Sequence, residues 1–134
     1  MSIIGRPDPD APMAETPQQP VAHPDAPASV VVLVRDLMFS SRIVATARAA
    51  DVPVTLLRDP AALAGAEGRL LIVDLNQSGA IDAAVAWKAR SLGTIVGFVS
   101  HVDADTIARA KAAGVDRVIP RSRFVEVLPE LLGL

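Results

Sequence analysis

The sequence predicts an α/β fold in which five parallel strands form one doubly wound sheet with helices on both faces. Two observations support this prediction. Residues 30–34 (VVVLV) and 70–73 (LLIV) are continuous apolar runs of the kind found in strands buried on both faces. Segments with helical spacing of apolar residues separate such runs along the chain. Each predicted strand is therefore followed by one helix.

The first half of this pattern covers residues 30–90. Phe39, Ile43, Ala47 and Ala50 fall on one face of the first helix. Asp59-Pro60 is typical of an N-cap followed by proline at the first helical position. The third helix is rich in alanine, and we expect Ile81, Val85, Ala84 and the aliphatic stem of Lys88 to face inward. The predicted strands are 30–34, 52–57 and 70–73, and the predicted helices are 39–50, 59–66 and 80–90.

The second half repeats the pattern over residues 94–132. Asp103 or Asp105 lies near the start of the next helix, and Gly114 is well placed to end it. Pro129 falls within the last helix as a kink or first-turn residue. The predicted strands are 94–99 and 115–119, and the predicted helices are 103–113 and 124–132.

Strands that are joined by single helices are parallel and connected by right-handed crossovers. At this size the most common solution is a flavodoxin-like (βα)5 sheet with strand order 2-1-3-4-5. In such sheets ligands bind at the carboxyl ends of the strands. The residues that follow each strand are therefore the candidates for a functional site.

Composition excludes several classes of protein. The chain has 134 residues, which suggests one main domain, and it has no cysteine for disulfides or thiolate metal sites. Its net charge of −2 gives no general attraction to nucleic acid or anionic lipid. No apolar run reaches the roughly 20 residues that span a bilayer, and residues 1–6 do not resemble a secretory signal. We expect a cytoplasmic protein without nucleic-acid or membrane partners.

The chain divides near residue 29. Residues 1–28 hold seven of the 11 prolines and carry one arginine against four acids, a formal charge of 1 − 4 = −3. Proline removes backbone donors, and the segment has few large apolar residues. We predict a flexible, acidic, proline-rich tail over 1–28 and a folded domain over 29–134.

Polar residues follow four strands that meet near the switch point of the predicted sheet. They would place two carboxylates, a hydroxyl and guanidinium groups around one shallow pocket. The members of this predicted pocket are Arg35, Asp36, Asp74, Ser100, His101 and Arg121.

These positions resemble the receiver domain of bacterial response regulators across most of residues 29–134. The first strand ends in Val-Leu-Val followed by Arg35-Asp36, and the third ends in Leu-Ile-Val-Asp74-Leu75. Ser100 follows the fourth strand, and Gly114-Val-Asp116 precedes the fifth. In that family the resemblance implies Asp74 as phosphoacceptor, Asp36 and Asp74 as Mg²⁺ ligands, Ser100 as the hydroxyl and Arg121 as the charge clamp.

The departures from the family pattern concern the same pocket. Arg35 stands at the first acid position and could pair with Asp36 or Asp74 in place of a metal. Arg121-Ser122 replaces the family's Lys-Pro, and the His101 ring would crowd the pocket. The chain has no tyrosine, so Val118 stands at the family's aromatic switch, and the loop over residues 75–79 is short.

We therefore predict a pseudo-receiver: a non-catalytic, phosphorylation-independent signalling and protein-interaction module that needs no cofactor. The first alternative is a genuine stand-alone receiver that is phosphorylated on Asp74 with Mg²⁺. The second is an unrelated small α/β ligand-binding protein, although no glycine-rich phosphate loop, nucleophile elbow or paired-histidine motif is present.

The expected contact surface is residues 101–134, by analogy with receivers. It would serve a protein partner or self-association. The final helix offers apolar side chains that could form an interface or could all belong to the core. These residues are Phe124, Val125, Val127 and Leu128.

Overall fold

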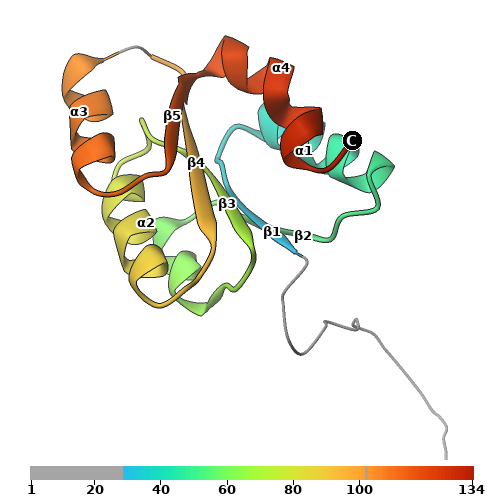
Figure 1. Cartoon of the computed structure of the whole chain (residues 1–134), viewed down its shortest axis with the longest axis horizontal. Coiled ribbons are helices and arrows are strands. Elements are labelled where there is room, and N and C mark those ends of the chain that lie inside the picture. Colours follow the sequence, from blue (N-terminus) through green and yellow to red (C-terminus); the bar gives the residue numbers. More distant parts are fainter. Residues whose placement is uncertain (1–28, 102) are drawn as a thin grey trace, which may run out of the picture.

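Five parallel strands lie side by side in the order β2-β1-β3-β4-β5, which confirms the predicted flavodoxin-like topology (Figure 1). The structure is a computed structural model that describes residues 29–101 and 103–134. The predicted tail over 1–28 lies outside the described residues. The strands are β1 (Val30–Leu33), β2 (Val54–Leu57), β3 (Leu70–Asp74), β4 (Thr94–Val99) and β5 (Arg117–Pro120).

Helices cover both faces of the sheet. The helix pair α1 (Leu37–Ala49) and α4 (Arg121–Leu131) lies on one face (Figure 1). The other face carries α2 (Ala80–Ala89), α3 (Ala104–Ala112) and the 3₁₀ helix η1 (Pro60–Gly65). Within this described part of the chain, no helix has the length and apolar character needed to cross a membrane.

The core forms two layers because the central strands are buried on both faces. Val31 and Leu33 of β1 pack toward α2 and η1, and Val30 and Val32 pack toward α1 and α4. Every residue of β1 is fully buried. Each such side chain contributes roughly 1.5–3 kcal/mol of transfer free energy. The second layer also holds three mutually packed phenylalanines, Phe39, Phe98 and Phe124, with ring centroids 4.9 to 5.7 Å apart.

Aspartate side chains cap three of the helices. Asp59 caps η1 with Pro60 at its first position, as the sequence predicts. Asp36 caps α1, which begins at Leu37 and not at the predicted residue 39. Asp103 caps α3 by accepting a hydrogen bond from the backbone N–H of Asp105. Gly114 follows α3 with a φ of +97°, a conformation that glycine adopts without strain.

Several predicted boundaries and one helix face were wrong. The strand expected at 52–57 begins at Val54, because the N–H of Val52 bonds to the helix carbonyl of Ala47. The last strand begins at Arg117 and the last helix at Arg121. Val85 was expected to face inward but is 39% exposed.

Trp87, and not Val85, is the residue of α2 that packs into the protein core. Its ring is fully buried, and its Nε1–H donates to the carbonyl of Ala66 at 3.1 Å. Ile81, Ala84 and Trp87 therefore form the inward stripe of α2. A buried indole with a satisfied N–H anchors α2 to the segment that follows η1.

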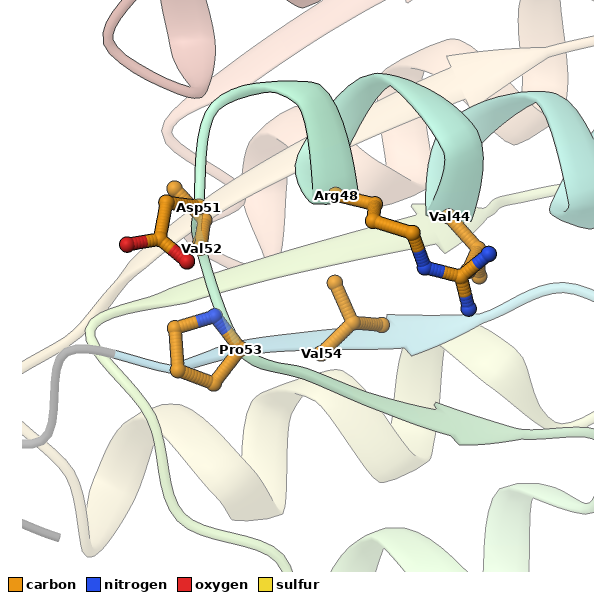
Figure 2. Close-up of a pocket in the computed structure, with 6 residues that line it drawn as sticks. All are labelled: Val44, Arg48, Asp51, Val52, Pro53 and Val54. Atoms are coloured by element: carbon orange, nitrogen blue, oxygen red, sulfur yellow. The ribbon is translucent and has the colours of Figure 1, made fainter. Parts of the chain in front are cut away.

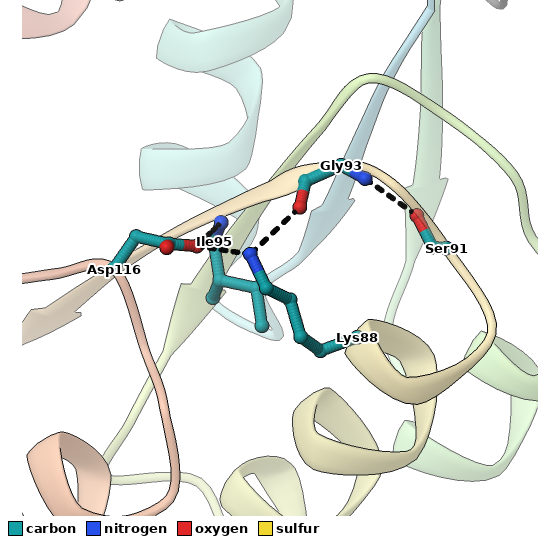
Figure 3. Close-up of polar contacts among 5 residues, drawn as sticks. All are labelled: Lys88, Ser91, Gly93, Ile95 and Asp116. Atoms are coloured by element: carbon teal, nitrogen blue, oxygen red, sulfur yellow. Dashed lines mark hydrogen bonds and ion pairs between the residues drawn. The ribbon is translucent and has the colours of Figure 1, made fainter.

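A small polar network joins α2 to the edge of the sheet (Figure 3). Lys88 Nζ donates to the Gly93 carbonyl at 3.0 Å and to Asp116 Oδ2 at 2.8 Å. The same carboxylate oxygen accepts the backbone N–H of Ile95 at 2.7 Å. The ladder between β4 and β5 begins with the pair Val96 and Arg117. The Asp116 side chain therefore accepts the N–H of Ile95, the β4 residue just before that ladder.

A substitution at Gly97 of β4 would test how closely β4 packs against Leu75 in the loop after β3. A Cβ added at Gly97 would lie 2.6 Å from Cγ and Cδ1 of buried Leu75. We expect Gly97→Ala to lower the free energy of unfolding by about 1–3 kcal/mol, because the core must shift to accept the methyl group. Urea unfolding measures the effect.

Gly65→Ala is the matched control. A Cβ at Gly65 meets nothing within 4 Å, so this variant should unfold close to the wild-type midpoint. Equal midpoints for Gly97→Ala and the wild type would contradict the packing described here.

Candidate functional site

Arg121 draws together three elements at the carboxyl edge of the sheet. Its Nη2 lies 3.2 Å from Asp36 Oδ2, and its Nη1 donates to Ser100 Oγ at 3.4 Å. Its guanidinium carbon lies 3.9 Å from the centroid of the Phe39 ring. Arg121, the first residue of α4, therefore contacts the start of α1 and the end of β4. Three of the predicted pocket residues, Asp36, Ser100 and Arg121, meet in this way.

Asp36 uses both carboxylate oxygens. Oδ1 accepts the backbone N–H of Phe39 at 3.1 Å and so caps α1, while Oδ2 faces Arg121. The Phe39 N–H, and after it the hydrogen bond from Arg121, lower the pKa of Asp36 below 3.8. The carboxylate is exposed and ionised at neutral pH, and both of its oxygens already have cationic or N–H partners.

Asp74 ends β3 and is the half-buried acid of the site. Its Oδ1 accepts the backbone N–H of Asn76 at 3.0 Å. Desolvation by burial raises the pKa of Asp74, and the nearby charge of Asp36 acts in the same direction. The Asn76 N–H and the charge of Arg121 oppose this shift without cancelling it. Asp74 therefore shares the electrostatic field of Asp36 and Arg121.

Asn76 organises the pocket, and its place two residues after Asp74 is the only sequence signal that could have pointed to it. Its Oδ1 accepts the backbone N–H groups of Ser100 at 2.7 Å and His101 at 2.9 Å. Its Nδ2 donates to the His101 carbonyl at 3.2 Å. One side chain thus joins the loop after β3 to the loop after β4 and fixes the backbone that carries Ser100.

The structure places two predicted pocket residues differently from expectation. Arg35 is exposed and, among the described residues, forms no ion pair with Asp36 or Asp74. It lines an open cavity with Arg58, Asp59 and Pro60, because its side chain lies toward the β2 end of the edge. His101 is also exposed, and it contributes its backbone N–H and carbonyl to Asn76.

The apolar side chains of the last helix, which could have formed an interface, are mostly buried in the core. Phe124, Val127 and Leu128 are 0%, 6% and 2% exposed and pack in the core, and Val125 is half-buried. Their spacing forms the inward stripe of α4 over the sheet. These side chains therefore do not offer the free apolar surface that the sequence suggested.

A second cavity lies at the opposite edge of the sheet (Figure 2). It has a volume of about 310 Å³ between α1 and the start of β2, with Arg48, Asp51 and Val54 in its lining. Ligands of open α/β sheets bind at the carboxyl ends of the strands. We therefore take the edge with Asp36, Asp74, Ser100 and Arg121 as the candidate site.

The described residues lack the cluster of ligating side chains that a metal centre needs. Across 29–101 and 103–134, no group of three or more His, Cys, Asp or Glu side chains is placed to hold a metal ion. Asp36 and Asp74 are the acids that lie near Arg121, and Arg121 pairs with Asp36.

Solved structures with the same fold are receivers of response regulators. A CheY-like receiver domain protein from Methanospirillum hungatei JF-1 matches with a TM-score of 0.65 at 13% identity, over 78% of this chain and 92% of that one. A receiver domain from Rhodospirillum rubrum matches with a TM-score of 0.63 at 20% identity, over 78% and 90% of the two chains. No protein-family model and no curated protein matches the sequence.

The NtrC4 receiver domain, solved in solution as a beryllofluoride-activated dimer, matches with a TM-score of 0.62 at 12% identity. The match covers 78% of this chain and 96% of that one. The chain therefore has the CheY-like receiver fold, and the receiver resemblance inferred from sequence is confirmed at the level of the fold.

The half-burial of Asp74 predicts a pH-dependent stability difference. A raised pKa means that the folded state favours the neutral form of Asp74. The contribution of Asp74 to the free energy of unfolding is therefore fully present below pH 3.8, the pKa of the group in the unfolded chain. It is lost as the pH rises through the pKa of the folded state. Asp74→Asn keeps an oxygen for the Asn76 N–H and removes the charge. We expect this variant to be more stable than the wild type at neutral pH, with the difference vanishing below pH 3.8.

Thermal unfolding from acid to neutral pH checks this expectation. Asp36→Asn should behave oppositely, because the pKa of Asp36 is lowered and its charge is stabilised by Phe39 N–H and Arg121. A loss of stability at neutral pH for Asp74→Asn would contradict the assignment of burial as the dominant effect.

Asn76→Ala should loosen the loop after β4. We expect amide hydrogen exchange at Ser100 and His101 to accelerate about fivefold, because a hydrogen bond of roughly 1 kcal/mol is removed. Ser78→Ala, an exposed change in the same loop, is the control and should leave these two amides unchanged. Unaltered exchange in Asn76→Ala would rule out the bridge.

Proposed function

We propose that this chain is a pseudo-receiver, a signalling module that binds a protein partner and works without phosphorylation of Asp74. The observation that carries the proposal is the contact of Arg121 with Asp36 and Ser100. In the receiver pattern these positions hold a metal ligand, a hydroxyl and a cationic clamp. Here the cation is bound directly to Asp36, so this acid already has its counter-charge.

A resident Mg²⁺ does not fit the donors at this edge. Mg²⁺ requires oxygen ligands in near-octahedral geometry. Arg35 stands where the family has an acid, and both oxygens of Asp36 already face N–H or guanidinium donors. A fixed guanidinium 3.2 Å from Asp36 Oδ2 also repels a divalent cation.

Asp74 is a weak candidate for phosphoryl transfer for the same reason. Such transfer depends on positioning and on neutralisation of charge around the phosphoryl group. The pKa of Asp74 is raised by burial. Among the described residues, its charged neighbours are the Arg121 guanidinium and the Asp36 carboxylate, and no third acid is placed to help these two hold a metal ion. These features support a scaffold more than an acceptor.

The contact surface proposed for a partner is the polar side of residues 101–134. α3 presents exposed Asp105, Arg109 and Lys111, and β5 presents Arg117. With the apolar stripe of α4 buried, recognition would rest on these charges. The NtrC4 receiver, which has the same fold, forms a dimer in solution, so a second copy is one possible partner.

A phosphodonor assay tests the proposal. Purified protein is incubated with acetyl phosphate, with and without Mg²⁺, and its intact mass is measured. We expect no phosphoryl adduct under either condition, because the pocket lacks a third ligand and Arg121 neutralises Asp36.

Asp74→Asn and Arg121→Lys are the matched variants. An Mg²⁺-dependent adduct of one phosphoryl group that disappears in Asp74→Asn would refute the pseudo-receiver and establish the genuine receiver. An adduct that appears in Arg121→Lys alone would instead support the proposal, since it would identify the arginine as the group that disables the pocket.

A further inference from the structure

An open cavity lies between α1 and α4, next to the acid pocket, and shares Ser100 and Arg121 with it. Its volume is about 500 Å³, within the range of small-ligand sites. Neither Asp36 nor Asp74 is among its lining residues. The polar part of the lining consists of Arg42, Ser100, Arg121 and Ser122.

The charge of this lining is entirely positive. Two guanidinium groups and two hydroxyls line the cavity, and no carboxylate does. The cavity beside Arg35 and Arg58 differs, because Asp59 is part of its wall. The cavity beside Arg48 differs in the same way, because it includes Asp51. Among these three cavities, the one between α1 and α4 has two cations and no acid.

Donors in the cavity are available for a ligand. Arg42 is exposed on α1 and forms no ion pair with a residue in the described part of the chain. Arg121 directs Nη1 and Nη2 to Ser100 and Asp36, which leaves its remaining N–H donors free of described partners. Ser122 lies in the first turn of α4, where the cap residue Pro120 makes no side-chain cap bond.

The rest of the wall is apolar and rigid. The Phe39 ring, which is 5% exposed, packs in the core and stacks under Arg121, whose guanidinium carbon lies 3.9 Å away. Pro120 and Val125 complete this side of the cavity. Stacking limits the motion of the guanidinium, so its orientation toward a ligand costs little conformational entropy.

We infer that this cavity binds a small oxyanion with an apolar body, such as a carboxylate or phosphonate on a ring. The oxyanion would accept hydrogen bonds from Arg42, Arg121 and Ser122, and the apolar body would lie on the exposed Pro120 and the half-buried Val125. Such a ligand competes with Asp36 for Arg121. The inference goes beyond the proposed function, because it does not depend on whether Asp74 accepts a phosphoryl group.

Titrations followed by NMR of the full ¹⁵N-labelled chain test the inference without Mg²⁺ or a phosphodonor. The probes are benzoate and phenylphosphonate, with benzamide as the neutral analogue and inorganic phosphate as the anion without a ring. We expect both ring anions to cause saturable shifts at the amides of Arg42 and of 121–124, with Kd near millimolar. Benzamide and inorganic phosphate should bind at least about tenfold more weakly.

Variants locate the binding on the chain. Arg42→Ala should weaken benzoate binding about tenfold or more, because a charge-assisted hydrogen bond is lost from an exposed residue without disturbing the fold. Arg48→Ala, two turns along the same helix, is the control and should bind as the wild type does. Asp36→Asn should tighten binding severalfold, because Arg121 loses its internal partner.

Three results would overturn the inference. The first is the absence of saturable shifts at about 10 mM ring anion, well beyond a millimolar Kd. The second is equal weakening by Arg42→Ala and Arg48→Ala, which would mean that the anion responds to general positive charge. The third is equal affinity for inorganic phosphate and phenylphosphonate, which would mean that the apolar wall is not used.

Discussion

Burial of the central strands on both faces is the constraint from which the rest of the structure follows. β1 exposes no side chain, so both its odd and its even residues must be covered by helices. This requirement places α1 and α4 on one side and η1, α2 and α3 on the other. Because a single helix joins each strand to the next, all strands are parallel and their carboxyl ends lie together. Asp36, Asp74, Ser100 and Arg121 gather there because each of them follows or ends one of these strands.

Arg121 determines what kind of site this edge becomes. A guanidinium that stacks on a core ring and reaches both an acid and a hydroxyl is held in place by three groups at once. Asp36 is equally committed, because it caps a helix with one oxygen and pairs with the other. The pocket is therefore satisfied from within. A site whose charges already have internal partners is suited to packing and recognition, and a transferable group would first have to displace those partners.

Much of the fold could be predicted because its signals are local and repeated. Apolar runs mark the strands, and Asp59-Pro60, Asp103 and Gly114 mark helix ends through their own backbone chemistry. The inward face of α2 was harder to predict, since Ile81, Ala84 and Val85 all fit a helical period in an alanine-rich segment. Trp87 occupies the core because its large ring buries more apolar surface than Val85 and its N–H finds the Ala66 carbonyl.

The site was predictable in position and less so in detail. Asp36, Asp74, Ser100 and Arg121 were identified because strand ends must converge. The direction of the Arg35 side chain was not determined by the pattern, since a residue just past a strand is free to turn to either side. Asn76 was missed because its role depends on where two separate loops meet in space. For Phe124, Val127 and Leu128 the sequence left an interface and the core as alternatives, and their burial shows that they form the helix stripe needed by the core.

The two outer strands of the sheet, β2 and β5, each have a proline at one end, which limits how copies of this chain can pair through the sheet. Pro53 directly precedes β2, and Pro120 is the last residue of β5. Proline has no N–H to offer a neighbouring strand, and both margin strands are four residues long. Both margin strands are thus short, and Pro120 offers no donor for a ladder with another molecule. We expect contacts between copies of this chain within the described residues to use helices or loops rather than these two strands.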